Sequence, residues 1–109
     1  MLATGWHNGG QPDEPGGYGI KLLPRDRDKY FEREWDEVVV ALDGGDSVAI
    51  SLSKSFWRTS TELRSPEVGR WLLDQGAAPW HKGSAPSVVV TPVEDNRFSA
   101  RVLKRRGLG

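Results

Sequence analysis

Two very short connections limit the folds available to this chain. Residues 37–42 (EVVVAL) and 47–52 (SVAISL) are apolar segments separated only by the four residues DGGD. Residues 87–93 (SVVVTPV) and 97–103 are separated by only three residues. A parallel crossover needs about a dozen residues, whereas glycine in a tight turn supplies the positive φ that a hairpin requires. The two connections therefore predict antiparallel hairpins and exclude a doubly wound parallel sheet.

The remaining segments predict one more strand and two short helices. Residues 19–23 (GIKLL) alternate as a short strand, and the proline that follows them can open a helix over residues 25–33. Ser65 begins the sequence SPE, a typical helix start because the hydroxyl caps free backbone amides, and Gly76 is a natural stop. The polar residues 53–65 are predicted to be an ordered loop that can contain one helical turn.

These elements together predict an α+β fold that is mainly β. Five strands with short links and two short helices favour an antiparallel, barrel-like sheet with the helices across its openings. Residues 18–103 are predicted to form a single globular domain. Residues 1–17 are rich in Gly and Pro, which predicts a flexible N-terminal arm, and residues 104–109 are predicted to be a basic C-terminal tail.

Charge is distributed unevenly along the chain. The 15 Lys and Arg residues balance the 15 Asp and Glu residues, but residues 1–53 carry ten acids and five bases, and residues 54–109 carry the reverse. The absence of cysteine fits a reducing compartment, and we expect a cytoplasmic location because no signal or membrane segment is recognised. The chain lacks the strong positive charge of many nucleic-acid-binding proteins, although a dipolar protein can still present a positive face.

Little in the sequence indicates catalysis or a cofactor. The only histidines, His7 and His81, have no acid at metal-ligand spacing, so we expect no metal site and no other cofactor. No nucleophile elbow or phosphate-binding glycine loop is recognised. Acid pairs such as Asp26 with Asp28 alternate with Arg and Lys, which indicates solvated helix surface with local ion pairs. A small hydrolase or nuclease built on these acids is the least favoured interpretation.

Four of the five tryptophans stand beside a basic residue or a histidine. Flat aromatic faces stack on bases while Arg or Lys neutralises phosphate, so this pattern favours nucleic-acid binding. The same pattern also suits a small core in which the ring is buried and the cation reaches solvent. Trp71, on an apolar helix face, is assigned to the core, whereas both interpretations stay open for Trp6, Trp57 and Trp80.

The order of these segments resembles the DNA-binding pseudobarrel superfamily, which includes plant transcription-factor domains and effector domains of restriction endonucleases. The resembling parts span residues 18–103: the sequence IKLLP leading into a short helix, the hairpin from Val38 to Leu52, the polar loop with Phe56, Trp57 and Arg58, and the later helix. The five predicted strands are fewer than the seven of that family. The resemblance implies a barrel that grips DNA with two arms on one edge.

Carried over by position, the resemblance implies two DNA-contacting segments. The implied contacts are Lys21, Arg25 and Arg27 in the first segment and Lys54, Ser55, Trp57 and Arg58 in the second. We therefore predict a non-enzymatic nucleic-acid-binding module, with Arg64 as a further candidate contact to phosphate. The alternative is a protein-interaction or small-ligand module in which Trp6, Trp57 and Trp80 line a pocket or an exposed patch. Neither interpretation involves a membrane.

Overall fold

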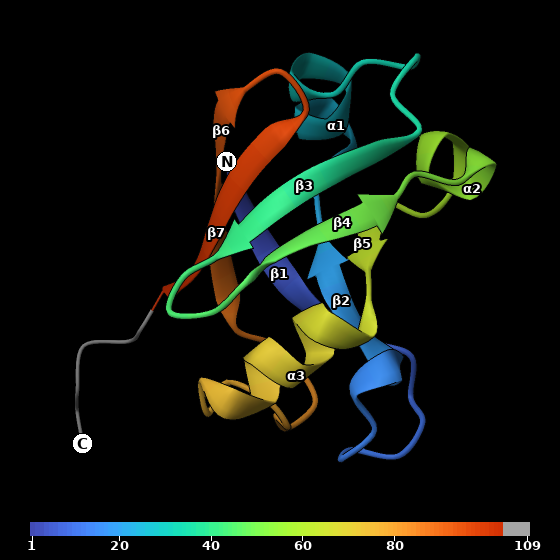
Figure 1. Ribbon diagram of the computed structural model, residues 1–109. Coiled ribbons are helices and arrows are strands. Elements are labelled where there is room, and N and C mark those ends of the chain that lie inside the picture. Colours follow the sequence, from blue (N-terminus) through green and yellow to red (C-terminus); the bar gives the residue numbers. More distant parts are fainter. Residues whose placement is uncertain (104–109) are drawn as a thin grey trace.

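Seven strands form one sheet in the computed structural model of the protein, which describes residues 1–103 (Figure 1). The order across the sheet is β4-β3-β7-β6-β1-β2-β5. The sheet curls into a nearly closed barrel, which confirms the predicted α+β, mainly β class. The strands are β1 (Leu2–His7), β2 (Tyr18–Lys21), β3 (Glu37–Leu42), β4 (Ser47–Ser51), β5 (Glu62–Arg64), β6 (Ser87–Glu94) and β7 (Arg97–Leu103).

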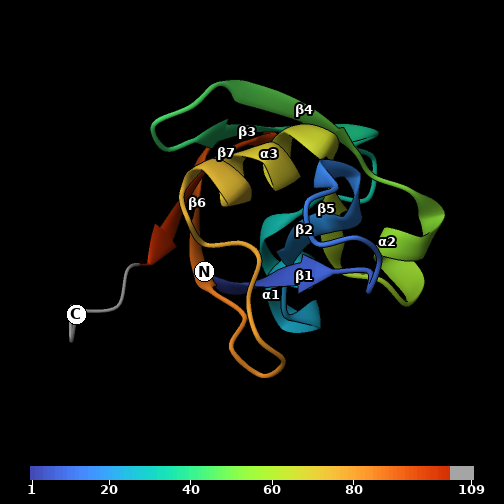
Figure 2. The same ribbon diagram turned by 90° about the horizontal axis from the view of Figure 1, so that it is seen from below.

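Three α-helices and one 3-10 turn complete the described part of the chain: η1 (Pro15–Gly17), α1 (Pro24–Tyr30), α2 (Lys54–Arg58) and α3 (Pro66–Asp74). Helices α1 and α3 confirm the two predicted helices. The Ser65 hydroxyl accepts a hydrogen bond from the Glu67 amide at the start of α3, and Gly76 adopts a φ of +73° after its end. Figure 2 shows α3 running beneath β3 and β4 at one opening of the barrel. Residues 53–65 contain the short helix α2, which agrees with the helical turn allowed in the predicted loop, but they also contain the strand β5, which was not predicted.

Both predicted hairpins are present, but the sheet is mixed and not wholly antiparallel. β3 pairs antiparallel with β4, and β6 pairs antiparallel with β7. β3 and β7 lie side by side and run in the same direction, with Val40 opposite Phe98. The long stretch of chain between β3 and β7 permits this parallel pairing, which no short turn could connect.

The prediction that residues 1–17 are an arm without regular structure is wrong. Leu2–His7 form β1, which lies between β6 and β2 in the sheet. Ala3 and Gly5 are buried, and the Gly5 amide donates to the carbonyl oxygen of Pro86 at 2.8 Å. The pairing partners are distant in sequence, so the local excess of Gly and Pro outside β1 gave no sign of them. The predicted basic tail, residues 104–109, lies outside the described residues.

Aromatic side chains fasten the first two helices to the sheet. Phe98 of β7 stacks on Phe31, just after α1, with ring centroids 4.6 Å apart, and Phe56 of α2 lies 5.3 Å from Phe31. All three rings are buried. Burying an aromatic side chain is among the larger single contributions to stability. This cluster brings α1 and α2 to the same end of the barrel.

Tyr18 predicts a change of stability at high pH. Burial raises the pKa of its hydroxyl above the ordinary 10.0, with a further contribution from the charge of Asp13. The folded state therefore holds this proton more tightly than the unfolded chain, so the stabilisation is complete below about pH 10 and declines as pH rises above it. We expect Tyr18→Phe to flatten the decline of the unfolding free energy between about pH 9.5 and 11.

Urea unfolding at a series of pH values measures this effect. Tyr18→Phe also removes the hydrogen bond from the hydroxyl to the Pro12 carbonyl oxygen (2.5 Å), which costs about 1 kcal/mol at neutral pH. Tyr30→Phe, at a half-buried ring, is the control and should keep the alkaline decline. An unchanged slope in Tyr18→Phe would contradict the assignment.

Candidate nucleic-acid interface

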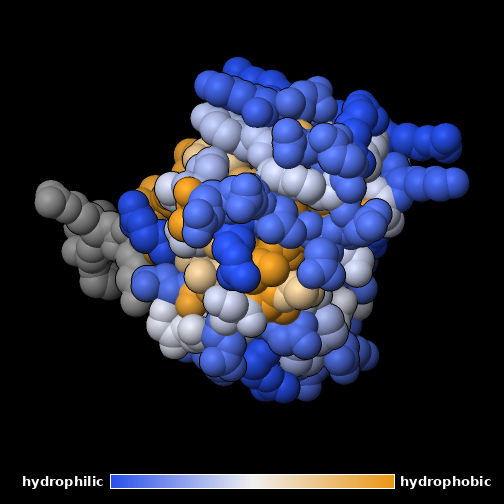
Figure 3. Space-filling view, turned by 45° about the horizontal axis from the view of Figure 1, so that its top comes forward, coloured by the Kyte–Doolittle hydropathy of each residue, from blue (hydrophilic) through white to orange (hydrophobic). Residues whose placement is uncertain are grey.

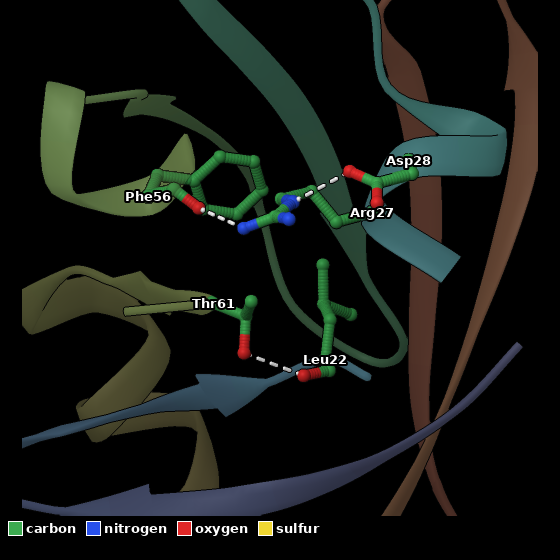
Figure 4. Close-up of polar contacts among 5 residues, drawn as sticks. All are labelled: Leu22, Arg27, Asp28, Phe56 and Thr61. Atoms are coloured by element: carbon green, nitrogen blue, oxygen red, sulfur yellow. Dashed lines mark hydrogen bonds and ion pairs between the residues drawn. The ribbon is translucent and has the colours of Figure 1, made fainter. Parts of the chain in front are cut away.

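The two segments proposed from sequence to contact DNA meet at one end of the barrel. The Leu22 amide donates to the Thr61 carbonyl oxygen at 2.9 Å, and the Thr61 hydroxyl donates to the Leu22 carbonyl oxygen at 2.6 Å. Both residues are buried. Figure 4 shows the hydrogen bond between Thr61 and Leu22, and close to it a hydrogen bond from Arg27 of α1 to Phe56 of α2. Residues close to the start of α1 are thereby joined to the chain just beyond α2.

Arg27 links the two helices from the inside. Its Nη1 donates to the Phe56 carbonyl oxygen at 3.0 Å, and its Nε donates to Asp28 at 3.0 Å (Figure 4). Only 9 % of the residue is exposed. A guanidinium held in this way stabilises the packing of α2 on α1 and is poorly placed to contact a phosphate. We therefore leave Arg27 out of the proposed contact surface, although the resemblance implied that it belongs there.

Two guanidinium groups lie close to the indole ring of Trp57. The Arg33 guanidinium carbon is 4.8 Å from the centroid of the indole, and that of Arg27 is 5.7 Å from it. The indole is half-buried, and its edge-on contact with Phe56 (5.3 Å) connects it to the core. Arg33 was not among the residues selected from sequence. Its position among alternating charges at the end of the predicted helix resembles ordinary solvated surface, so only the fold places it beside Trp57.

The other basic side chains at this end are exposed. Lys54 and Arg58 project from α2, while Lys21 and Arg25 flank the start of α1. Within residues 1–103 the one ion pair is that of Arg27 with Asp28, so none of these four cations is neutralised by a contacting carboxylate. Ser55 is half-buried, and its hydroxyl shares a 2.7 Å hydrogen bond with that of Ser53.

Arg64 occupies a separate position on the outer face of the sheet. It lies opposite Gly19 of β2, which in turn lies opposite Trp6 of β1. Because Gly19 has no side chain, the Arg64 guanidinium can reach the Trp6 indole, 5.3 Å from its centroid. In the next row of this face, Lys21 lies opposite Glu62. Arg64 of β5 and Trp6 of β1 thus form a second aromatic–cation pair.

Acidic residues are interspersed with these cations. Residues 21–37 and 54–64 together contain eight Lys and Arg residues and seven Asp and Glu residues. A surface with this balance lacks the broad positive field that attracts polyanions over long distances. Contact with a phosphate would depend on individual exposed cations.

Trp6 and Trp80 do not line a common pocket. A Cβ added to Gly5 would lie 3.0 Å from the Trp80 ring, so Trp80 covers the face of β1 on which a side chain at position 5 would lie. Successive residues of a strand face opposite sides, which places Trp6 on the other face. Trp80 packs edge-on against Tyr18, with centroids 5.4 Å apart. The three-tryptophan patch of the alternative interpretation is therefore not assembled in the form expected.

Within residues 1–103, no group of three or more His, Asp or Glu side chains is positioned to share a metal ion. No helix in the same range combines the length and apolar character needed to cross a bilayer.

Comparison of the chain with protein-family models, with curated proteins and with solved structures found no match. The structure itself has a nearly closed, barrel-like mixed sheet of seven strands, the strand count that the resemblance implied. Membership of the DNA-binding pseudobarrel superfamily remains a prediction.

Proposed function

We propose that the protein is a non-enzymatic DNA-binding module that uses the end of the barrel formed by α1 and α2. The observation that carries the proposal is that two segments distant in sequence lie side by side. The hydrogen bonds from Arg27 to Phe56 and from Thr61 to Leu22 hold them together. Lys21 and Arg25 belong to one segment, and Lys54 and Arg58 belong to the other. Two sets of cations on one rigid edge can contact phosphates on both sides of a groove.

The exposed rim of Trp57 supports the same proposal. An indole stacked on Arg33 presents a flat surface beside a positive charge, which suits contact with a sugar or an unpaired base. Figure 3, which brings the α1 end forward, shows a mainly hydrophilic surface with apolar areas between the polar side chains. The interspersed acids favour a contact of modest affinity, in which a few cations supply most of the attraction.

A salt series tests the proposal. Binding of a labelled duplex of about 20 base pairs, and of one of its strands, is measured by fluorescence anisotropy from about 50 to 300 mM NaCl. The logarithm of the affinity should fall by about 0.9 per phosphate contact for each logarithmic unit of salt. The double variant Lys54→Ala/Arg58→Ala should bind the duplex about tenfold or more weakly, with a slope smaller by about two units.

The matched control removes two exposed cations from the opposite end. Arg70 lies on α3 and Lys82 lies in the loop between α3 and β6, away from α1 and α2 (Figure 1). Arg70→Ala/Lys82→Ala should keep both affinity and slope within about twofold. Absence of binding at 50 mM NaCl, or an equal loss in both double variants, would refute the proposal.

A further inference from the structure

β4 is an edge strand with unpaired backbone groups. Its neighbour in the described sheet is β3 alone. The Leu42 amide donates to the Asp46 carbonyl oxygen, and the Leu52 amide donates to that of Asp36. Leu42 with Asp46, and Leu52 with Asp36, are therefore hydrogen-bonded pairs of the ladder between β3 and β4. Pairs of this kind alternate along an antiparallel ladder. The backbone N–H and C=O groups directed to the open side are therefore those of Ser47, Ala49 and Ser51.

Nothing in the composition of β4 protects this edge. Natural edge strands commonly carry a lysine, a proline or a bulge that prevents a further strand from pairing. The sequence of β4 is SVAIS, and its register with β3 is uninterrupted over five residue pairs. The outward side chains are small and exposed, so they offer no steric barrier to an added strand.

A groove of about 440 Å³ runs between this strand and α3. Its apolar lining comes from Leu42, Val48 and Trp71, and the Trp71 indole is held in place by a hydrogen bond from Nε1 to the Asp43 carbonyl oxygen at 2.9 Å. The volume lies within the range of about 300–1,000 Å³ common for binding sites. An open strand edge and a preformed apolar groove therefore occur side by side.

The charges around the groove indicate the chemistry of its occupant. Asp46, Glu67 and Asp74 line it, with Arg70 as the one basic lining residue. None of these side chains forms an ion pair within residues 1–103. Three carboxylates against one guanidinium favour an occupant with a Lys or Arg side chain.

The groove suits a separate extended segment better than a second copy of this chain. If two β4 strands paired with each other, the residues facing the groove from the second copy would be Val48 and Ile50. Those side chains are already buried in their own core, with 7 % and 2 % exposed. A second copy would thus pair with the free backbone groups of β4 but would leave the groove unfilled.

We propose that the groove between β4 and α3 binds an extended segment of a partner protein, which adds to β4 as an eighth strand. The segment places alternate apolar side chains against Val48 and Trp71 and a basic side chain near Asp74. Main-chain hydrogen bonds to Ser47, Ala49 and Ser51 supply affinity, and the groove supplies selectivity. This surface lies at the α3 end of the barrel and is distinct from the proposed DNA contact.

An NMR titration of the full chain tests the proposal. The probe is the capped peptide TLTRTLT, whose two Leu and one Arg share one face when it is extended. The expected result is a saturable change in the amide signals of β4 and α3, with slowed hydrogen exchange at Ser47, Ala49 and Ser51. No change at millimolar peptide would overturn the proposal, as would a dimer of the free protein with these amides already protected.

Two substitutions at one position separate edge pairing from folding. Proline is tolerated at an edge where its missing N–H would face solvent, so Ala49→Pro should fold and should bind the peptide at least tenfold more weakly. Ala49→Thr keeps the N–H and a strand-compatible side chain, and should bind within about twofold of the original protein. Equal binding by both variants would overturn the pairing through β4. Duplex DNA binding should be unaffected in both.

A charge exchange tests the choice of a basic partner. Asp74 lies at the end of α3, where a cation suits the helix dipole, so Asp74→Lys should not weaken the helix. It should reduce the affinity for TLTRTLT and increase that for the matched peptide TLTETLT, changing their ratio by at least tenfold. An unchanged ratio would overturn the assignment of a basic segment.

Discussion

Gly69→Ala is expected to lower the unfolding free energy by about 3 kcal/mol or more, the largest effect of any substitution considered for this protein. A Cβ at this position would lie 1.8 Å from the Pro15 carbonyl oxygen and 2.6 Å from its carbon. Both are backbone atoms of η1, so no side-chain rotation can relieve the overlap. Relief requires α3 and η1 to separate, which would expose Val68 and Leu72 of α3, now fully buried.

Helix propensity opposes this effect only in part. Alanine is favoured over glycine within a helix by about 1 kcal/mol, so the expected loss is what remains after that gain. Urea unfolding followed by circular dichroism measures it. Arg70→Ala, at the exposed next position of the same helix, should change stability by no more than about 0.5 kcal/mol. A Gly69→Ala protein as stable as the original would contradict the close packing of α3 on η1.

Arg27→Ala is expected to cost about 2–4 kcal/mol of unfolding free energy. The substitution leaves the Phe56 carbonyl oxygen without its donor in a buried place, removes the guanidinium next to the Trp57 ring, and leaves a cavity between α1 and α2. The unpaired carbonyl accounts for about 1–3 kcal/mol, and the lost packing and cation–π contact add about 1 kcal/mol.

The matched control is Arg25→Ala, which removes an exposed arginine from the same helix. It should alter stability by about 0.5 kcal/mol or less, while weakening DNA binding if the proposed function is correct. Arg27→Met separates charge from packing, because it retains most of the apolar contact and loses the hydrogen bonds. A stability of Arg27→Ala within about 0.5 kcal/mol of the original would show that the contact with Phe56 does not hold the two helices together.

Elements with local signals were predicted close to their observed bounds. The hairpin of β3 and β4 depends on apolar alternation and a glycine turn, and α3 depends on the Ser65 cap and the Gly76 stop, all within a few residues. β1 and β5 were missed because each is a strand by virtue of distant partners. Residues 2–4 of β1 pair with β6 and residues 4–7 pair with β2, while Leu63 of β5 pairs with Ile20 of β2.

The candidate site likewise has features that the sequence predicts and features that only the fold decides, here for single residues. Residue type alone predicted that exposed cations and Trp57 would occur on two segments, and the resemblance implied that they share one edge. Neither residue type nor the resemblance could distinguish the exposed Arg25 from the buried Arg27, because the two lie two positions apart on one short helix and carry the same side chain. Helix geometry turns Arg25 to solvent and Arg27 toward Phe56, so one remains available for contact and the other becomes part of the core.

The amino-acid sequence by itself determined the turns, the helix caps, the alternation of the hairpin strands and hence a mainly β domain, because these depend on backbone preferences of neighbouring residues. Only the tertiary structure decided the order of the strands, the parallel contact of β3 with β7, the open edge of β4 and the burial of Arg27. Each of these depends on which distant segments bury apolar surface together, and local preferences carry no information about that choice.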